Sequence, residues 1–170
     1  SIAYGFELVH NRIKSTAQAK DLNIAGNLIR SFDNFGPIPT RYPSDGSHYN
    51  TAAIYGNFRY DLSNKTTLVF GGRFTSTHLK ANWKETALID ASLNLVDVKN
   101  NALTGSFSVS YRPKTDWRLN LLLSSGFRSP NVDDLGKIRE NKGMLLVPNP
   151  NLNPEYVYNI DGGIAYLPLD

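Results

Sequence analysis

Side chains that could perform catalysis or hold a metal ion are few and widely separated in this chain. His10, His48 and His78 are the three histidines, and no two of them have the short spacing of a metal-ligand pair. Asp133 and Asp134 are adjacent, but they lack the oxygen-rich spacing of a calcium loop, which favours an ordinary solvated loop. The sequence has no cysteine, which excludes thiol nucleophiles, thiolate metal sites and disulfides. These residues predict neither a metal site nor a cofactor.

Two short segments have the composition of a catalytic or phosphate-binding loop without its context. Ser124-Ser125-Gly126 is not a nucleophile elbow, and no Ser/His/Asp set converges by position along the expected strands. Gly71-Gly72 does not lead from a strand into a helix, so it predicts a bend or a close approach of neighbouring strands rather than a phosphate loop. A hydrolase is therefore disfavoured, and we expect no enzyme of any class.

The charged residues are arranged more regularly than these groups. Five arginines fall on the polar side of alternating segments, whereas the lysines fall in turns, loops or strand ends. Guanidinium groups pair well with carboxylates in an enclosed polar space, so we expect these arginines and two carboxylates to face a lumen or a plug. The set is Arg59, Arg73, Arg112, Arg118, Arg128, Glu155 and Asp161. The formal net charge is only +3 and no basic stripe carries interleaved aromatics, so a nucleic-acid partner is not expected.

These side chains can share a face only if the segments that carry them are β-strands. Residues 104–128 alternate almost without error: Phe107 and Val109 point one way, and Ser108 and Ser110 point the other. The pattern predicts an all-β, antiparallel up-and-down meander of about six strands. The expected strands are about 2–9, 51–60, 66–79, 104–112, 117–127 and 155–166.

The expected connections alternate strictly in length. Asp61–Lys65 and Pro113–Asp116 are tight turns, whereas 10–50, 80–103 and 129–154 are long. This alternation places all short turns at one end of the sheet, as in outer-membrane barrels. The aromatics and prolines of 10–50 predict an ordered surface there. No apolar run approaches the roughly 18–20 residues of a spanning helix, which excludes a helical membrane protein.

One large aromatic residue marks the short-turn end of most expected strands. Tyr4, Tyr60, Tyr111, Trp117 and Tyr166 all lie on the apolar side of their segments. Aromatic rings of this kind prefer the boundary between membrane and water, so we interpret the five as an aromatic girdle. The ordinary alternative is a β-sandwich core, because tyrosine and tryptophan are common in strands.

Two motifs near the end of the chain resemble a known family. GFRSPNVDDLG at 126–136 and NPNLNPE at 149–155 are similar to the late barrel strands of TonB-dependent outer-membrane receptors, where a GFRxPN…ELG segment precedes NPxLxPE. Asn153 stands where that family often has a basic residue. Pro130 and Pro154 would end strand pairing on either side of the loop. Arg128 and Glu155 would brace neighbouring strands, or one of them would contact the plug.

The resemblance implies a portion of a large transmembrane β-barrel in the outer membrane of a Gram-negative bacterium, with residues 1–170 as part of the barrel domain. Such a receptor takes up a scarce nutrient, such as an iron chelate, cobalamin, a nickel complex or an oligosaccharide, with energy from TonB. Its partners would be outer-membrane lipid, a plug domain and TonB. The chain begins at Ser1 without methionine, so we expect a processed, trimmed or fragmentary product.

Other interpretations of the same pattern remain open. A soluble β-sandwich or a lipocalin-like module that binds a ligand or carbohydrate would bury the apolar face in a protein core. A complete small barrel is disfavoured, because six strands fall below the usual minimum of about eight. An isolated piece of a barrel would have two unpaired edges and an uncovered apolar face. We therefore expect it to self-associate or to require detergent.

Overall fold

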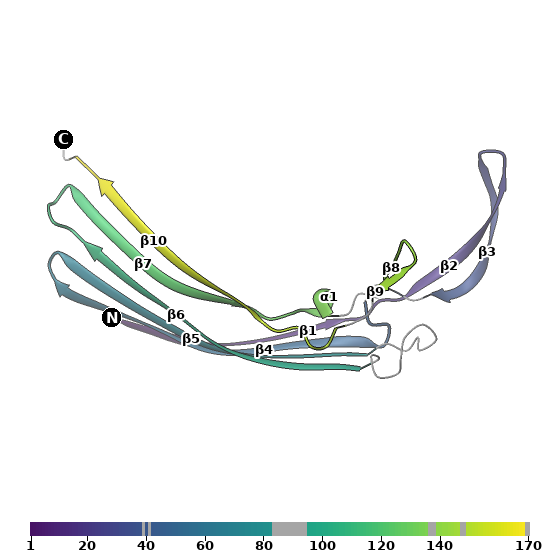
Figure 1. Ribbon diagram of the computed structural model, residues 1–170, viewed down its shortest axis with the longest axis horizontal. Helices are drawn as coiled ribbons and strands as arrows, with labels where there is room; N and C mark the ends of the chain where they lie inside the picture. The colour runs from purple at the N-terminus through teal and green to yellow at the C-terminus, as the bar shows by residue number, and fades with distance from the viewer. Residues whose placement is uncertain (39, 41, 83–94, 136–138, 147–148, 169–170) are drawn as a thin grey trace.

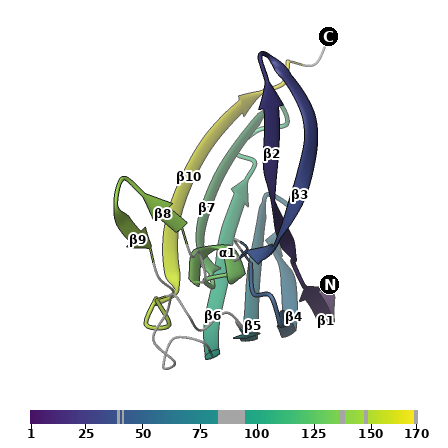
Figure 2. The ribbon, with the colours of Figure 1, turned by 90° about the vertical axis from the view of Figure 1, so that its right-hand side faces the viewer.

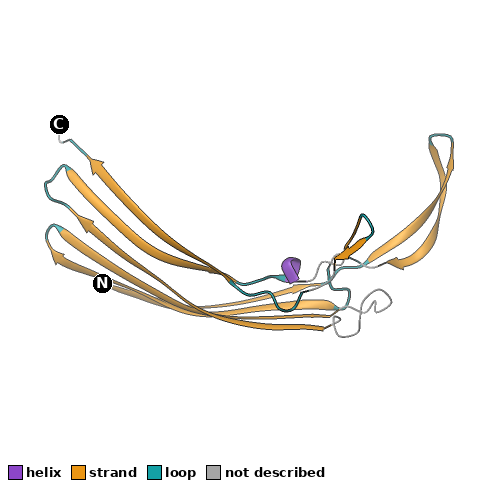
Figure 3. Cartoon of the chain, viewed as in Figure 1, coloured by secondary structure: helices purple, strands orange, loops and turns teal. Residues whose placement is uncertain are grey.

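The computed structural model of the chain is almost entirely β-structure (Figure 3). It describes residues 1–38, 40, 42–82, 95–135, 139–146 and 149–168. Six long strands form one antiparallel sheet in the order β1-β4-β5-β6-β7-β10, which is not closed into a barrel (Figures 1 and 2). Their bounds are β1 Ile2–Ile13, β4 Gly46–Ser63, β5 Thr66–Asn82, β6 Leu95–Tyr111, β7 Trp117–Arg128 and β10 Glu155–Tyr166. The predicted antiparallel meander is confirmed.

Smaller elements occupy the segments between the long strands. They are the hairpin of β2 Ala17–Ala25 and β3 Leu28–Ile38, the helix α1 Val132–Leu135, and the hairpin of β8 Arg139–Asn141 and β9 Met144–Leu146. All lie at one end of the sheet, which we call the loop end (Figure 1). The tight β4–β5 and β6–β7 connections lie at the other, the turn end. The segment 10–50, which the sequence predicts to be a long connection with an ordered surface, therefore contains a β-hairpin. No helix in the described residues has the length and hydropathy to span a membrane.

The register assigns each side chain to one of two faces. Val109 pairs with Leu121 across β6 and β7, and Arg118 lies on the opposite face of β7. We call the face with Val109 the outer face and the face with Arg118 the inner face. The outer face carries Phe107, Val109, Leu119, Leu121 and Ile160, and the inner face carries Arg118, Asn159 and Asp161, as the alternation predicts. A helix that packs on the inner face, α1, lies on the concave side of the sheet (Figure 1).

Four strands are longer than the sequence pattern predicts, and the first is β1, which continues to Ile13 rather than ending near residue 9. β4 begins at Gly46 rather than near 51, β5 continues to Asn82, and β6 begins at Leu95 rather than near 104. The alternation of the predicted strands does not extend into these segments, because their apolar residues fall at the opposite parity. In the structure the alternation continues with its phase reversed: Val96 lies on the inner face, whereas Val109 on the same strand lies on the outer face.

The reversal builds a small hydrophobic core on the inner face at the loop end. Leu79 and Val96 are almost completely buried there, and the helical residues Val132 and Leu135 cover them. The full cluster is Leu79, Ala81, Val96, Val132 and Leu135, with Tyr42, Tyr49, Val98 and Leu152 packed around it. At this level the protein itself covers the inner face of the sheet.

Candidate functional site

The outer face near the turn end is an uncovered apolar band. Leu103 is 76% exposed and Ile160 is 75% exposed, although both are large aliphatic side chains. On β6 the band runs from Leu103 to Tyr111, and its rows continue onto β5 and β4. A tilted strand needs about 9–11 residues to cross the hydrocarbon layer of a membrane, and the band has that height. A soluble sandwich would need a second sheet here, and the described residues place none over this face.

The five aromatic residues expected to form a girdle all lie on the outer face, in a stepped series. Trp117 pairs with Tyr166, and their ring centroids are 4.8 Å apart. Tyr111 pairs with Leu119, which is the next outward-facing residue of β7 after Trp117 and lies further from the turn end. Along the same sheet Tyr60 lies higher again, and Tyr4, opposite Gly56, lies highest. Strands in a barrel tilt against its axis, so residues at one height along the axis occupy stepped positions in the register of neighbouring strands. The girdle remains a prediction.

A cationic hollow lies on the inner face at the turn end. It has a volume of about 540 Å³, and its lining brings together Arg59, Arg112 and Arg118 from three strands or strand ends. Lys65 adds a fourth cation to the lining, and Asp61 is its one carboxylate. The side-chain nitrogen Nε of Arg118 is buried without a hydrogen-bond partner in the described part of the chain.

Asp61 neutralises only part of this charge. Arg59 donates hydrogen bonds from Nε and Nη2 to Asp61 Oδ1, each at 3.2 Å. Thr67 donates to the same oxygen at 2.7 Å. Neither Arg112 nor Arg118 forms an ion pair with a described residue. The hollow therefore keeps a surplus of positive charge for an external anionic group.

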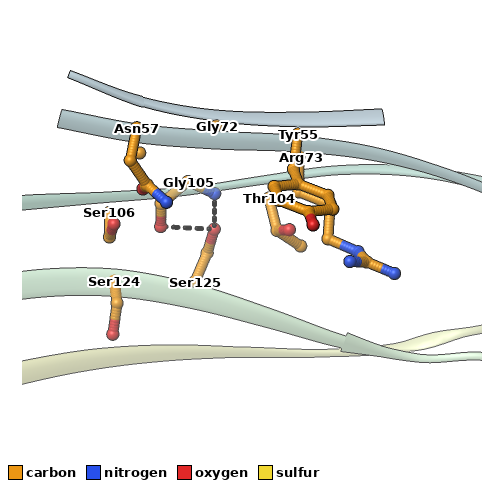
Figure 4. Close-up of a pocket in the computed structure, with 10 residues that line it drawn as sticks. Tyr55, Asn57, Gly72, Arg73, Thr104, Gly105, Ser106, Ser124 and Ser125 are labelled. Atoms are coloured by element: carbon orange, nitrogen blue, oxygen red, sulfur yellow. Dashed lines mark hydrogen bonds between the residues drawn. The ribbon is translucent and has the colours of Figure 1, made fainter. Parts of the chain in front are cut away.

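A second hollow of about 280 Å³ lies midway along the inner face (Figure 4). Its wall is formed by small and polar residues, with the aromatic ring of Tyr55 and the guanidinium of Arg73 at one side. Gly71 lies beneath it: a Cβ at this position would be 2.5 Å from both Asn57 Oδ1 and Ser106 Oγ. The expected close approach at Gly71-Gly72 is thus confirmed at the first glycine, and at Gly72 a Cβ would meet open space.

Arg73 links three strands beside this hollow. Its Nη2 donates to Glu7 Oε1 of β1 at 2.8 Å, across the intervening strand β4. Its guanidinium carbon also lies 5.7 Å from the ring centroid of Tyr55, within reach of a cation–π interaction. Tyr55 in turn covers Gly5, where a Cβ would lie 2.6 Å from the tyrosine hydroxyl. The partner Glu7 was not foreseen, because sequence alternation gives the face of a residue but not its register.

The expected pair of Arg128 and Glu155 is confirmed, and Arg128 has a second partner. Its Nη1 lies 3.3 Å from Glu155 Oε2, and its Nη2 lies 2.8 Å from Asp134 Oδ2. The sequence predicts that Asp134 is an ordinary solvated loop residue. This prediction is wrong, because its carboxylate pairs with Arg128. Its carboxylate also accepts a hydrogen bond from the backbone N–H of Asn131 at 3.1 Å. One arginine thus joins the end of β7, the start of β10 and the helix α1.

Asn131 and Ser129 complete this arrangement, and we call residues 128–135 the latch. Asn131 Oδ1 accepts the backbone N–H groups of Asp133 at 2.8 Å and Asp134 at 3.0 Å, which caps the short helix. Ser129 Oγ lies 2.9 Å from Thr77 Oγ1 of β5 and accepts a hydrogen bond from Asn100 Nδ2 of β6 at 3.0 Å. The GFRSPN motif therefore closes the inner face of the sheet at the loop end.

The remaining sequence candidates are separate from these hollows. Asp161 lies on the inner face of the edge strand β10 and accepts a hydrogen bond from Asn159. His10 and His48, far apart in sequence, have ring centroids 5.5 Å apart on the outer face. In the described part of the chain, no group of three His, Asp or Glu residues is placed to hold a metal ion.

Comparison with known proteins agrees with the motifs. Residues 3–170 match the family described as "TonB dependent receptor-like, beta-barrel". No curated protein matches the chain. The match spans almost all of its residues, including both the apolar band and the latch.

Proposed function

Because the chain belongs to the TonB-dependent receptor β-barrel family, whose members are outer-membrane transporters of Gram-negative bacteria, we propose that it forms part of a receptor wall for uptake of a scarce nutrient. Energy would come from TonB acting on a plug domain inside the barrel. The observation that carries the proposal is the division of one sheet into an uncovered apolar band and a polar inner face with two hollows. That division suits a strand wall between lipid and an aqueous lumen.

The cationic hollow at the turn end is the proposed contact for the plug. Its four cations, Arg59, Lys65, Arg112 and Arg118, face a single carboxylate, so carboxylates of a plug would complete the pairing. Exposed ion pairs contribute only about 0–1 kcal/mol each. A plug held by several such contacts is positioned firmly but can still be displaced when TonB pulls.

The loop end would face outward and form part of the nutrient vestibule. Long loops of outer-membrane barrels are extracellular, and short turns are periplasmic. The β2–β3 hairpin extends from this end, and the latch closes the inner face beneath it (Figure 1). The nutrient class in this proposal is open between an iron chelate, cobalamin, a nickel complex and an oligosaccharide.

Cysteine labelling in intact cells tests the orientation, because the chain has no native cysteine. Asn27, in the exposed turn between β2 and β3, and Asn64, in the β4–β5 turn, are matched asparagines at opposite ends of the molecule. In the full receptor, Asn27→Cys should react with an impermeant maleimide, and Asn64→Cys should react only after lysis. Ser44 is a poor choice for the outer position because its side chain is buried.

Growth on limiting nutrients tests transport itself. Deletion of the receptor should abolish use of one nutrient class from the panel above, and loss of TonB should have the same effect. Restoration by the parent receptor but not by a receptor carrying Arg112→Glu and Arg118→Glu would place the cationic hollow in the transport cycle. Unchanged uptake of every class after deletion, or labelling of Asn64→Cys alone in intact cells, would contradict the proposal.

A further inference from the structure

Basic side chains gather on the outer face directly beyond the apolar band. The row that borders the band contains Leu8, Ala52 and Ser76, which face one another across β1, β4 and β5. The next two rows toward the loop end carry basic residues on all four strands β1, β4, β5 and β6. In register order they are His10–Asn50–His78–Lys99 and Arg12–His48–Lys80–Asp97.

This set, the outer cationic patch, consists of His10, Arg12, His48, His78, Lys80 and Lys99. Asp97 is the one acidic residue in the two rows, and it lies 2.7 Å from His78 Nε2 and 3.2 Å from Lys80 Nζ. Asp97 lies beyond the band, and the hydrogen bonds from His78 and then Lys80 hold its pKa below the usual range. Arg12 and Lys99 form no ion pair with any described residue. The patch therefore keeps an excess of positive charge.

A hollow marks the boundary between the band and the patch. It has a volume of about 330 Å³, with Leu8 and Ala52 on the band side and His10 and His78 on the patch side. The small outward side chains of Ala52 and Ser76 leave this depression in the sheet surface. One wall is thus apolar and the other offers hydrogen-bond donors, which is the arrangement that a lipid needs at the junction of its acyl chains and its headgroup.

We propose that the outer cationic patch binds the phosphate group of an anionic lipid in the surrounding membrane leaflet. The proposal rests on the orientation given above, because the patch must lie at the headgroup level of the leaflet at the loop end. Its continuity with the apolar band favours a lipid over a soluble anion, because the acyl chains would lie on rows that already face hydrocarbon. Each lysine or arginine near an anionic membrane surface makes its own favourable contribution to the binding free energy, and these contributions add.

A matched pair of triple variants tests the proposal in the full receptor, purified in detergent. The probe is phosphatidic acid, whose binding is followed by native mass spectrometry and calorimetric titration, with phosphatidylcholine as the neutral comparison. Arg12→Gln, Lys80→Gln and Lys99→Gln together should weaken phosphatidic acid binding by roughly a hundredfold, since each cation contributes about fivefold. The control removes the same charge elsewhere, at Arg30, Lys114 and Lys142, and should leave binding within about twofold of the parent.

Removal of the acidic residue should act in the opposite direction. Asp97→Asn should strengthen phosphatidic acid binding by about fivefold. Retention of heat-modifiable mobility in gels would establish that each variant is folded, and Asp97→Asn keeps the proposal testable if the triple variant is not.

Three outcomes would overturn the proposal: equal loss of binding in the control triple, unchanged binding in the patch triple, and competition by inorganic phosphate at the concentrations of lipid used. The last would identify a soluble anion site. If the lipid-binding tests fail while Asn27→Cys is still labelled from outside, the proposed lipid site is wrong. The proposed receptor function then stands.

Discussion

Strands β4, β5 and β6 pass through two regions in which the roles of their faces are exchanged. Near the turn end the outer face is apolar and uncovered, and the inner face is polar. Near the loop end the inner face is apolar and buried beneath the latch, and the outer face is charged. The same strands therefore meet apolar surroundings on opposite sides at the two levels. In the first region lipid would supply those surroundings, and in the second the protein supplies them itself.

The exchange has an energetic consequence for where each region gains its stability. Burial by protein side chains depends on close packing, so a cavity at the loop end is costly. An outer-face side chain in the band would instead be surrounded by fluid lipid, which can fill a small gap. The free energy of unfolding should therefore differ most between the two regions when a side chain is shortened. It should differ least when a substitution changes only the freedom of the backbone.

The largest difference should come from shortening a leucine in each region. Leu79→Ala, in the buried inner-face cluster, should lower the free energy of unfolding by about 2–5 kcal/mol. Leu103→Ala, on the exposed outer face of the neighbouring strand, should cost only the transfer free energy of the removed groups, about 2 kcal/mol, because lipid fills the gap and no cavity remains. Denaturant unfolding of the receptor in lipid vesicles measures both, and equal losses would show that the regions do not differ in this way.

A positive charge placed on either of two adjacent residues of β5 should distinguish the outer face of the sheet from its inner face. Phe70→Arg introduces a guanidinium on the outer face, where the cost near a bilayer midplane is about 2–4 kcal/mol. Val69→Arg places the same group in the polar lining of the inner hollow, on the face away from the apolar band, and should cost much less. The yield of folded receptor in vesicles and its denaturant midpoint report the difference. A greater loss for Val69→Arg would reverse the assignment of lipid and lumen.

Loosening the latch should destabilise the loop end alone. Asn131→Ala removes the side-chain oxygen that accepts the N–H groups of Asp133 and Asp134, which should cost about 0.5–2 kcal/mol locally. Hydrogen exchange should rise for 129–135 and for the covered parts of β5 and β6, with the band unchanged. The exposed Asn151→Ala serves as the comparison, and equal exchange in both variants would exclude a capping role for Asn131.

The smallest expected effect is at the paired glycines of β5. Gly71→Ala should cost about 1 kcal/mol, because its Cβ meets Asn57 and Ser106 side-chain atoms that can move aside only partly. Gly72→Ala points into open space on the other face and should change stability by no more than a few tenths of a kcal/mol. Thermal unfolding in detergent compares the two, and a larger loss at Gly72 would contradict the close approach at Gly71.

Much of the turn-end region was predictable from residue order, whereas the loop-end region was not. Period-two alternation identified the strands, and their faces followed without knowledge of register. An alternation of fixed phase does not predict the extensions at 46–50 and 95–103, because the face that carries the apolar residues changes there. A reversal of phase, as between Val98 and Leu103, is the signal that would have found them. The spacing of the three histidines in the sequence gives no sign that the sheet brings them together in the outer patch.

The sequence by itself determined the class of fold and the facing of each strand near the turns. These depend on alternation and on the order of short and long connections, which are local properties. Only the tertiary structure decided the register that brings Arg73 to Glu7, the burial of Leu79 beneath α1, and the gathering of the outer cationic patch. Each of these depends on how far one strand is shifted against the next. That shift is the outcome of packing summed over the whole sheet.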